Sequence, residues 1–192
     1  MSLPPEEQGR ANFYGLISRL FYAAPDAALL VALGSADDLQ ADDEALASSW
    51  RELQRAAARA DVEAVRDEYE TSFVGTGKAP VTLYVGAYSA RYSSEVPVAQ
   101  LKSDLAALGF ARRIDAGEPE DHVAALCDVM RHLIAQQRPL EEQKRFFERW
   151  IEPNIEPLCA AIDNTERTSF YRLVGRLAKA FFSLEQSAFE ML

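Results

Sequence analysis

Two short segments contain residue patterns that are typical of ligand-binding or catalytic sites. The first, residues 75–78, reads Gly-Thr-Gly-Lys and is similar to the end of a phosphate-binding loop. A complete loop of this kind needs a glycine five residues before its Gly-Lys pair and a serine or threonine after the lysine. This sequence has Ser72 and Ala79 at those positions. The segment is therefore interpreted as an interhelical loop, and a weak nucleotide-binding enzyme stays an alternative.

The second segment, residues 117–122, reads Gly-Glu-Pro-Glu-Asp-His. Pro119 suits the first position of a helix, where no backbone donor is needed. Glu120 and Asp121 would then lie at the positive end of the helix dipole. This helix start does not account for His122. A carboxylate beside an imidazole can hold the basic group of a peptide or another polar ligand.

Other kinds of chemistry find no support in the residue pattern. His122 and His132 lie ten residues apart, and neither belongs to a Cys/His set with metal-ligand spacing. No serine lies in a Gly-x-Ser-x-Gly motif. Cys127 and Cys159 lie within apolar helical patterns, as core cysteines do. We therefore expect no catalytic residue, no metal and no cofactor.

The charge balance bears on the choice of partner. The chain has 192 residues, with 30 carboxylates against 20 lysines and arginines, and a formal net charge of −10. Such a surface repels nucleic-acid phosphates, so no nucleic-acid partner is expected. It attracts a basic peptide or a basic partner protein. Acidity also keeps proteins in solution, so charge alone does not separate partner binding from solubility.

Nothing in the sequence predicts a membrane or secreted protein. There is no run of about 18 apolar residues, so no stable membrane insertion is expected. Residues 1–10 are polar and acidic and lack the regions of a secretory signal. With only two cysteines, a cytoplasmic location is the expectation.

Helices are expected to position these segments. Apolar residues recur at helical spacing along almost the whole chain, and strand-like alternation is nearly absent. The pattern predicts an all-α fold, a single globular helical bundle of about eight or nine helices, forming one domain over residues 1–192. The helices are expected over about residues 6–22, 26–33, 43–60, 62–73, 97–108, 119–134, 139–162 and 170–184.

Some helix ends can be predicted from single residues. Asp42 or Asp43 is expected to start the third helix, and Asp61 to cap the fourth. Pro153 and Pro157 are expected to bend or split the helix that begins near residue 139, because each removes a backbone donor.

An aromatic group surrounds the glycine loop at residues 74–80. Residues 81–92 are rich in aromatic and small side chains, and the pattern leaves a short helix or an irregular segment open. Most of the group is expected to be core. The remainder could line a groove for an extended or helical peptide. The group consists of Tyr69, Phe73, Tyr84, Tyr88 and Tyr92.

Four segments, in their order and spacing, resemble the TorD/DmsD/NarJ-like family of cytoplasmic maturation chaperones for molybdoenzymes, which are molybdenum-containing redox enzymes. Residues 10–21 resemble the first helix of that family. Residues 68–75, with Pro80 and Tyr84 downstream, resemble its Tyr-x-x-(Leu)-Phe-x-Gly loop. Residues 118–122 resemble its Glu-x-Pro-Asp-His signature, with one glutamate between the proline and the aspartate. Residues 143–147 and 170–177 resemble its last helices.

This resemblance implies a cytoplasmic chaperone that is not an enzyme. It would bind the apo-form of a molybdopterin-dependent oxidoreductase, through its twin-arginine signal peptide or another segment, until cofactor insertion and folding are complete. A helical adaptor or regulatory protein unrelated to redox enzymes stays an alternative. Long interhelical loops leave a homodimer formed by helix swapping open.

The resemblance also implies a set of client-peptide binding residues. Aromatic and proline side chains would take the apolar part of the peptide, and Glu118, Asp121 and His122 would take its basic part. The complete set is Tyr69, Phe73, Gly75, Pro80, Tyr84, Glu118, Pro119, Asp121 and His122.

Overall fold

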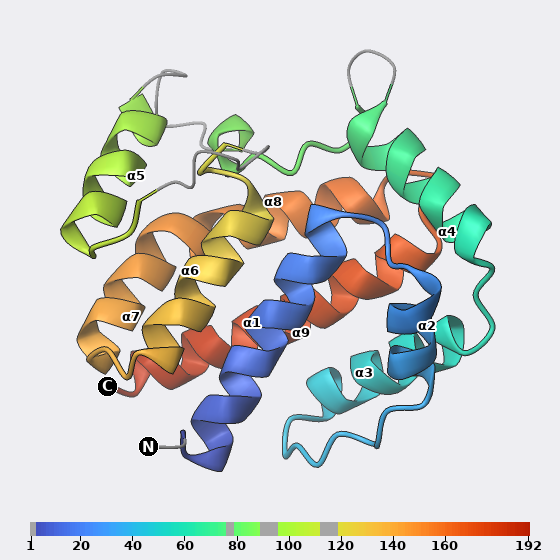
Figure 1. The fold of residues 1–192 in the computed structure, drawn as a ribbon, viewed down its shortest axis with the longest axis horizontal. Coiled ribbons are helices and arrows are strands. Elements are labelled where there is room, and N and C mark those ends of the chain that lie inside the picture. The colour runs from blue at the N-terminus through green and yellow to red at the C-terminus, as the bar shows by residue number, and fades with distance from the viewer. Residues whose placement is uncertain (1–2, 76–78, 89–95, 112–118) are drawn as a thin grey trace. The chain divides into compact units, whose positions relative to one another are not determined.

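The computed structural model of the chain describes residues 3–75, 79–88, 96–111 and 119–192 (Figure 1). These residues form nine α-helices, two short π-helices and one 3₁₀-helix, and the described part of the chain contains no β-strand. The predicted all-α fold class and the number of helices are therefore confirmed. An isolated antiparallel bridge joins Tyr84 to His122.

The chain divides into two compact units. The first unit comprises residues 1–18 and 82–154, and the second comprises residues 19–81 and 155–192. Two of the three boundaries fall inside helices, one in α1 (Pro5–Tyr22) and one in α8 (Glu152–Asp163). The single domain over residues 1–192 stays a prediction.

The second unit is built around the pairing of α3 (Glu44–Ala57) with α9 (Phe170–Glu190). Helix α2 (Ala27–Gly34) packs on α3, and α4 (Val62–Tyr69) packs on α9. The end of α2 approaches the backbone of Ala58, the residue after α3, so closely that position 34 has no room for a side chain. A Cβ atom there would lie 2.8 Å from the backbone nitrogen and Cα of Ala58.

Local hydrogen bonds begin three of these helices. Asp26, Asp43 and Asp61 each accept a bond from the backbone N–H three residues ahead, at 2.8, 2.7 and 2.9 Å. Such a cap satisfies one of the backbone donors that a helix start leaves without a partner. The expected cap at Asp61 is confirmed, and of the two candidates for the third helix Asp43 is the one used.

The first unit contains α5 (Val96–Ala107), α6 (Val123–Ala135) and α7 (Leu140–Phe146). Helix α6 buries the apolar face that the sequence pattern predicted, which places its buried side chains at helical spacing. These side chains are Val123, Leu126, Cys127, Met130, Leu133 and Ile134.

The two prolines do not split their helix. Helical residues run without interruption through α7, a π-helix (Phe147–Ile151) and α8. Pro153 is the second residue of α8, at the change from π- to α-helical bonding. Pro157 lies inside α8. Of the expected bend or split, the split does not occur, and the bend stays a prediction.

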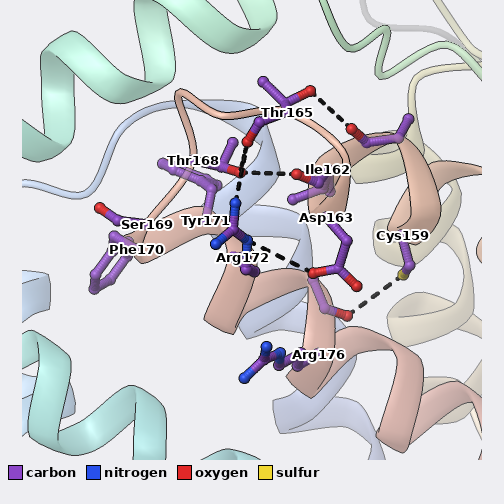
Figure 2. Close-up of polar contacts among 12 residues, drawn as sticks. Cys159, Ile162, Asp163, Thr165, Thr168, Ser169, Phe170, Tyr171, Arg172 and Arg176 are labelled. Carbon is purple, nitrogen blue, oxygen red and sulfur yellow. Dashed lines mark hydrogen bonds and ion pairs between the residues drawn. The ribbon is translucent and has the colours of Figure 1, made fainter.

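Polar contacts order the turn between α8 and α9 (Figure 2). The Thr168 hydroxyl donates to the Ile162 carbonyl at 2.7 Å and to the Thr165 carbonyl at 2.9 Å. The Arg172 guanidinium donates to the same Thr165 carbonyl at 3.2 Å, and its Nε lies 3.9 Å from the Asp163 carboxylate. These contacts bring the first turn of α9 back against the end of α8.

Both cysteines are core residues, as predicted. Burial raises the pKa of the Cys127 thiol, and it raises the pKa of the Cys159 thiol to about 12. The Cys159 thiol donates to the Gly175 carbonyl at 3.4 Å (Figure 2). At neutral pH both thiols therefore stay protonated and are poor nucleophiles.

Among the described helices, none combines the length and the apolar character needed to cross a membrane.

Candidate functional site

Part of the segment that ends in Asp121 and His122 and part of the aromatic-rich segment 81–92 form one small site in the first unit. The Val85 N–H donates to the Asp121 carbonyl at 3.0 Å, and the Val123 N–H donates to the Leu83 carbonyl at 2.9 Å. These bonds form the antiparallel bridge around Tyr84 and His122. We call residues 83–86 and 119–123 the bridge site. This site contains four of the predicted binding residues, namely Tyr84, Pro119, Asp121 and His122.

His122 caps helix α6. Its Nδ1 accepts a hydrogen bond from the Ala124 N–H at 3.1 Å, so this nitrogen carries no proton. The side chain is only 4% exposed, and the Tyr84 ring contacts it edge to face at 5.3 Å between centroids. Tyr84 itself is 37% exposed. Of this aromatic pair, the tyrosine is therefore the surface that a ligand can reach.

Pro119 does not begin the helix, contrary to the expectation. Helix α6 begins at Val123, and the His122 N–H donates to the Pro119 carbonyl at 3.2 Å. Residues 119–122 therefore form a turn ahead of the helix, and Glu120 and Asp121 lie outside its first turn. The reason is the bridge, which uses the backbone groups of Asp121 and Val123 to bind residues far away in sequence.

The Asp121 carboxylate is half-buried against the 3₁₀-helix Val85–Ala87. It accepts a hydrogen bond from the Gly86 N–H, and a Cβ atom at Gly86 would lie 3.0 Å from its Oδ2. Burial raises the pKa of the carboxyl group, the Gly86 and Asp121 N–H groups lower it, and the Glu120 charge raises it. Burial is the largest effect, so the net change in pKa is upward.

Glu120 connects the bridge site to α5. Its carboxylate lies 3.8 Å from the Lys102 Nζ. The Glu120 side chain is largely buried, whereas that of Lys102 is exposed. Glu118, the other predicted acidic ligand, lies outside the described residues.

The raised pKa of Asp121 predicts how the free energy of unfolding depends on pH. The folded chain holds this proton more tightly than the unfolded chain, so ionisation of Asp121 opposes folding. As the pH rises from about 4 through the raised pKa, the wild-type chain should therefore lose stability relative to Asp121→Asn. Urea unfolding of both proteins between pH 4 and 7.5 measures the difference. If the difference in free energy of unfolding between wild type and Asp121→Asn did not change with pH, the pKa of Asp121 would not be raised.

The predicted aromatic ligands Tyr69 and Phe73 lie in a buried cluster of the second unit. Ring centroids of Phe73 and Tyr171 are 4.9 Å apart, those of Tyr69 and Phe73 are 5.4 Å apart, and those of Phe21 and Phe73 are 6.3 Å apart. Tyr69 and Phe73 are each 9% exposed. Both rings are therefore mainly core, as the sequence pattern indicates for most of the aromatic group.

The phenol groups of this cluster are bound within the fold. The Tyr69 hydroxyl donates to the carbonyls at the end of α1, Phe21 at 3.1 Å and Tyr22 at 2.9 Å. The Tyr171 hydroxyl donates to the Leu20 carbonyl at 3.0 Å, and burial raises its pKa. The cluster thus closes the C-terminal end of α1, where carbonyl groups lack partners within the helix.

Gly75 ends the π-helix Glu70–Val74 that follows α4. It has a positive φ of 59°, and its N–H donates to the Glu70 carbonyl at 2.7 Å. Glycine adopts this conformation at no steric cost. Pro80 is exposed. Residues 76–78, which include the lysine of the phosphate-loop pattern, lie outside the described residues.

Sequence reasoning missed Glu68, which caps α9. Its carboxylate accepts bonds from the backbone N–H groups of Ser169 at 2.9 Å, Phe170 at 3.1 Å and Tyr171 at 2.6 Å, and from the Ser169 hydroxyl at 2.7 Å. A carboxylate is favoured at a helix N-terminus by both hydrogen bonding and the helix dipole. No local pattern signals a cap whose partners lie about a hundred residues further along the chain.

The matched region of a known family contains the whole bridge site, and Tyr69 and Phe73 of the aromatic cluster. The pattern of the nitrate reductase delta subunit family matches residues 39–160, which is well over half of the chain. The chain belongs to this family. The resemblance to TorD/DmsD/NarJ-like proteins drawn from the sequence is therefore confirmed.

Members with curated names support the same placement. This delta-subunit family member is 26% identical over 202 residues to the chaperone protein TorD of Shewanella loihica, covering 96% of this chain and 94% of the relative. It is 27% identical over 161 residues to the chaperone protein TorD of Ferrimonas balearica, covering 80% of this chain and 74% of the relative. Both relatives are named as chaperones.

A solved structure has the same fold. A crystal structure from Archaeoglobus fulgidus, described as a redox enzyme maturation protein, aligns with a TM-score of 0.56 and 18% identity. The alignment covers 92% of this chain and 93% of that chain. The all-helical fold is therefore shared along nearly the whole length of this delta-subunit family member.

Proposed function

We propose that this chain is a chaperone that holds an immature molybdenum-containing redox enzyme until its cofactor is inserted, and that it binds the twin-arginine signal peptide of that enzyme. Family membership and the two chaperone relatives support the general role. The observation that carries the choice of ligand is the bridge site, because its backbone bonds join the segment of the half-buried Asp121 carboxylate to the segment of the partly exposed Tyr84.

Asp121 suits the arginine part of such a peptide. A carboxylate has about four lone-pair positions, so two backbone donors leave room for a guanidinium. Charge-assisted bonds of this kind are about twice as strong as neutral ones. Because burial raises the pKa of Asp121, a bound arginine would favour its ionised form and release a proton at acidic pH.

Tyr84 suits the apolar part of the peptide. The residue is partly exposed, and its ring already packs against His122, which limits the side-chain entropy that is lost on binding. The net charge of −10 also favours encounter with a peptide that begins with basic residues.

The test is calorimetry of the purified chain with synthetic twin-arginine signal peptides from the molybdoenzymes of the same organism. We expect Asp121→Asn to weaken binding of the client peptide about tenfold, or about 1.4 kcal/mol, because it removes one charge pair and keeps an acceptor for Gly86. His122 stays unchanged in this variant, because it caps α6 and its loss would mix folding with binding.

The matched control is Asp67→Asn, which removes an exposed charge from α4 and should leave the affinity unchanged. A peptide with both arginines replaced by glutamine should bind wild type and Asp121→Asn equally. Equal affinity of Asp121→Asn and wild type for the twin-arginine peptide would reject Asp121 as its ligand. Failure of every signal peptide to bind would favour the helical adaptor.

A further inference from the structure

A pocket of about 300 Å³ lies in the first unit between α5 and the stretch from Arg138 to Trp150. Phe146 and Trp150, which are 4% and 7% exposed, form its apolar base, and Ala107 and Leu108 line the side formed by the end of α5. This volume is at the lower end of the range for small-ligand sites. The pocket shares no residue with the bridge site or with the buried aromatic cluster.

Five charged side chains line the pocket, and four of them are paired. The Arg138 Nη2 lies 2.7 Å from the Glu142 carboxylate. The Arg149 Nη1 lies 3.1 Å from the Asp104 carboxylate. The fifth, Arg145, donates through Nε to the Glu141 carbonyl at 3.2 Å, and it has no carboxylate partner among the described residues. Three arginines and two carboxylates leave the lining with one positive charge.

The pairs hold the pocket in a defined shape. The Trp150 indole N–H donates to Asp104 Oδ2 at 2.9 Å, so this carboxylate has two partners on the opposite helical stretch. The Arg149 guanidinium lies 5.2 Å from the centre of the Trp150 ring. A ligand would therefore meet preformed walls and would pay little to order them.

We infer that this pocket binds a single carboxylate attached to an apolar or aromatic group. Arg145 pairs with the carboxylate, because a guanidinium matches the two oxygens of such a group. The apolar part lies against Phe146 and Trp150. A polyphosphate is disfavoured because Asp104 and Glu142 would repel its further charges. This ligand class is independent of the signal-peptide proposal.

Two sources share this chemistry: a small organic acid, and an acidic side chain beside an apolar one in a polypeptide. The probes are therefore 3-phenylpropionate, its neutral amide, and the capped dipeptide acetyl-Phe-Glu-amide. Binding of the free acid alone would identify a small-molecule site. Binding of the dipeptide as well would identify a polypeptide segment as the ligand.

The two tryptophans of the chain provide the readout. In a ¹H–¹⁵N spectrum, the indole N–H of Trp150 reports on the pocket, whereas that of Trp50 donates to the Asp37 carbonyl in the second unit. We expect 3-phenylpropionate to shift the Trp150 signal with a Kd on the order of 1 mM, and to leave the Trp50 signal in place. The neutral amide should shift neither.

Arg145→Gln should weaken binding of 3-phenylpropionate at least fivefold. The side chain is exposed, so the amide spectrum of the variant should remain that of the folded chain. Arg55→Gln, which removes an exposed arginine from α3, is the matched control and should bind as wild type does. Three results would each overturn the inference: no shift of Trp150, equal shifts with the neutral amide, or full affinity in Arg145→Gln.

Discussion

Replacing Phe73 with alanine should lower the free energy of unfolding by about 3 to 5 kcal/mol, because it leaves a cavity in a well-packed core. The Phe73 ring contacts the rings of Tyr69, Tyr171 and Phe21, and its side chain is 9% exposed. Total stabilities of about 5 to 15 kcal/mol are usual, so this single change would remove a large share. Urea unfolding followed by circular dichroism measures it.

Val74→Ala is the control for this change. Val74 is the next residue in the same π-helix and is 58% exposed, so its truncation should cost less than about 0.5 kcal/mol. If Phe73→Ala cost as little as Val74→Ala, the Phe73 ring would not be core. Its role as a ligand for the client peptide would then become the better interpretation.

A second substitution at position 73 tests whether Phe73 contacts the client peptide. Phe73→Leu keeps most of the buried volume, so it should fold and bind a signal peptide as wild type does if Phe73 acts only in the core. A loss of peptide affinity in a stable Phe73→Leu protein would instead support direct contact with the client.

Replacing Glu68 with alanine should lower the free energy of unfolding by about 2 to 3 kcal/mol. The carboxylate satisfies three backbone donors at the start of α9 and one hydroxyl. Helix caps are usually worth about 1 kcal/mol, and hydrogen bonds to a charged group are worth more than neutral ones. Water can reach exposed Ser169 in the variant, which limits the loss.

Two further variants separate the cap from general effects of charge. Glu68→Gln keeps an acceptor but loses the charge and should recover part of the stability. Asp67→Ala removes a neighbouring exposed carboxylate and should change stability by less than about 0.5 kcal/mol. Equal stabilities of Glu68→Ala and Asp67→Ala would mean that α9 does not depend on this cap.

Local sequence was enough to predict most helices and several of their ends. An N-cap such as Asp43 or Asp61 acts on a donor three residues away, so the information lies within one helical turn. The buried face of α6 repeats every three to four residues, which a single segment also displays. The all-helical class therefore follows from interactions within each segment.

The candidate site was predicted in part. The choice of Asp121, His122 and Tyr84 as members of one site came from a family resemblance, and the structure brings them together. Sequence reasoning placed a helix start at Pro119, because proline and two acidic residues are typical there. It could not foresee the bridge that makes His122 the cap, since residues 83–85 lie far from it in sequence.

The helices, the acidic charge balance and the burial of the cysteines could be predicted without a structure, since each follows from local periodicity or composition. The contacts between residues far apart in the sequence depend on the tertiary structure. Glu68 binds donors at the start of α9, and Tyr69 binds carbonyls at the end of α1. Such partners meet only after the helices pack, because no local rule of spacing relates residues so distant in the chain.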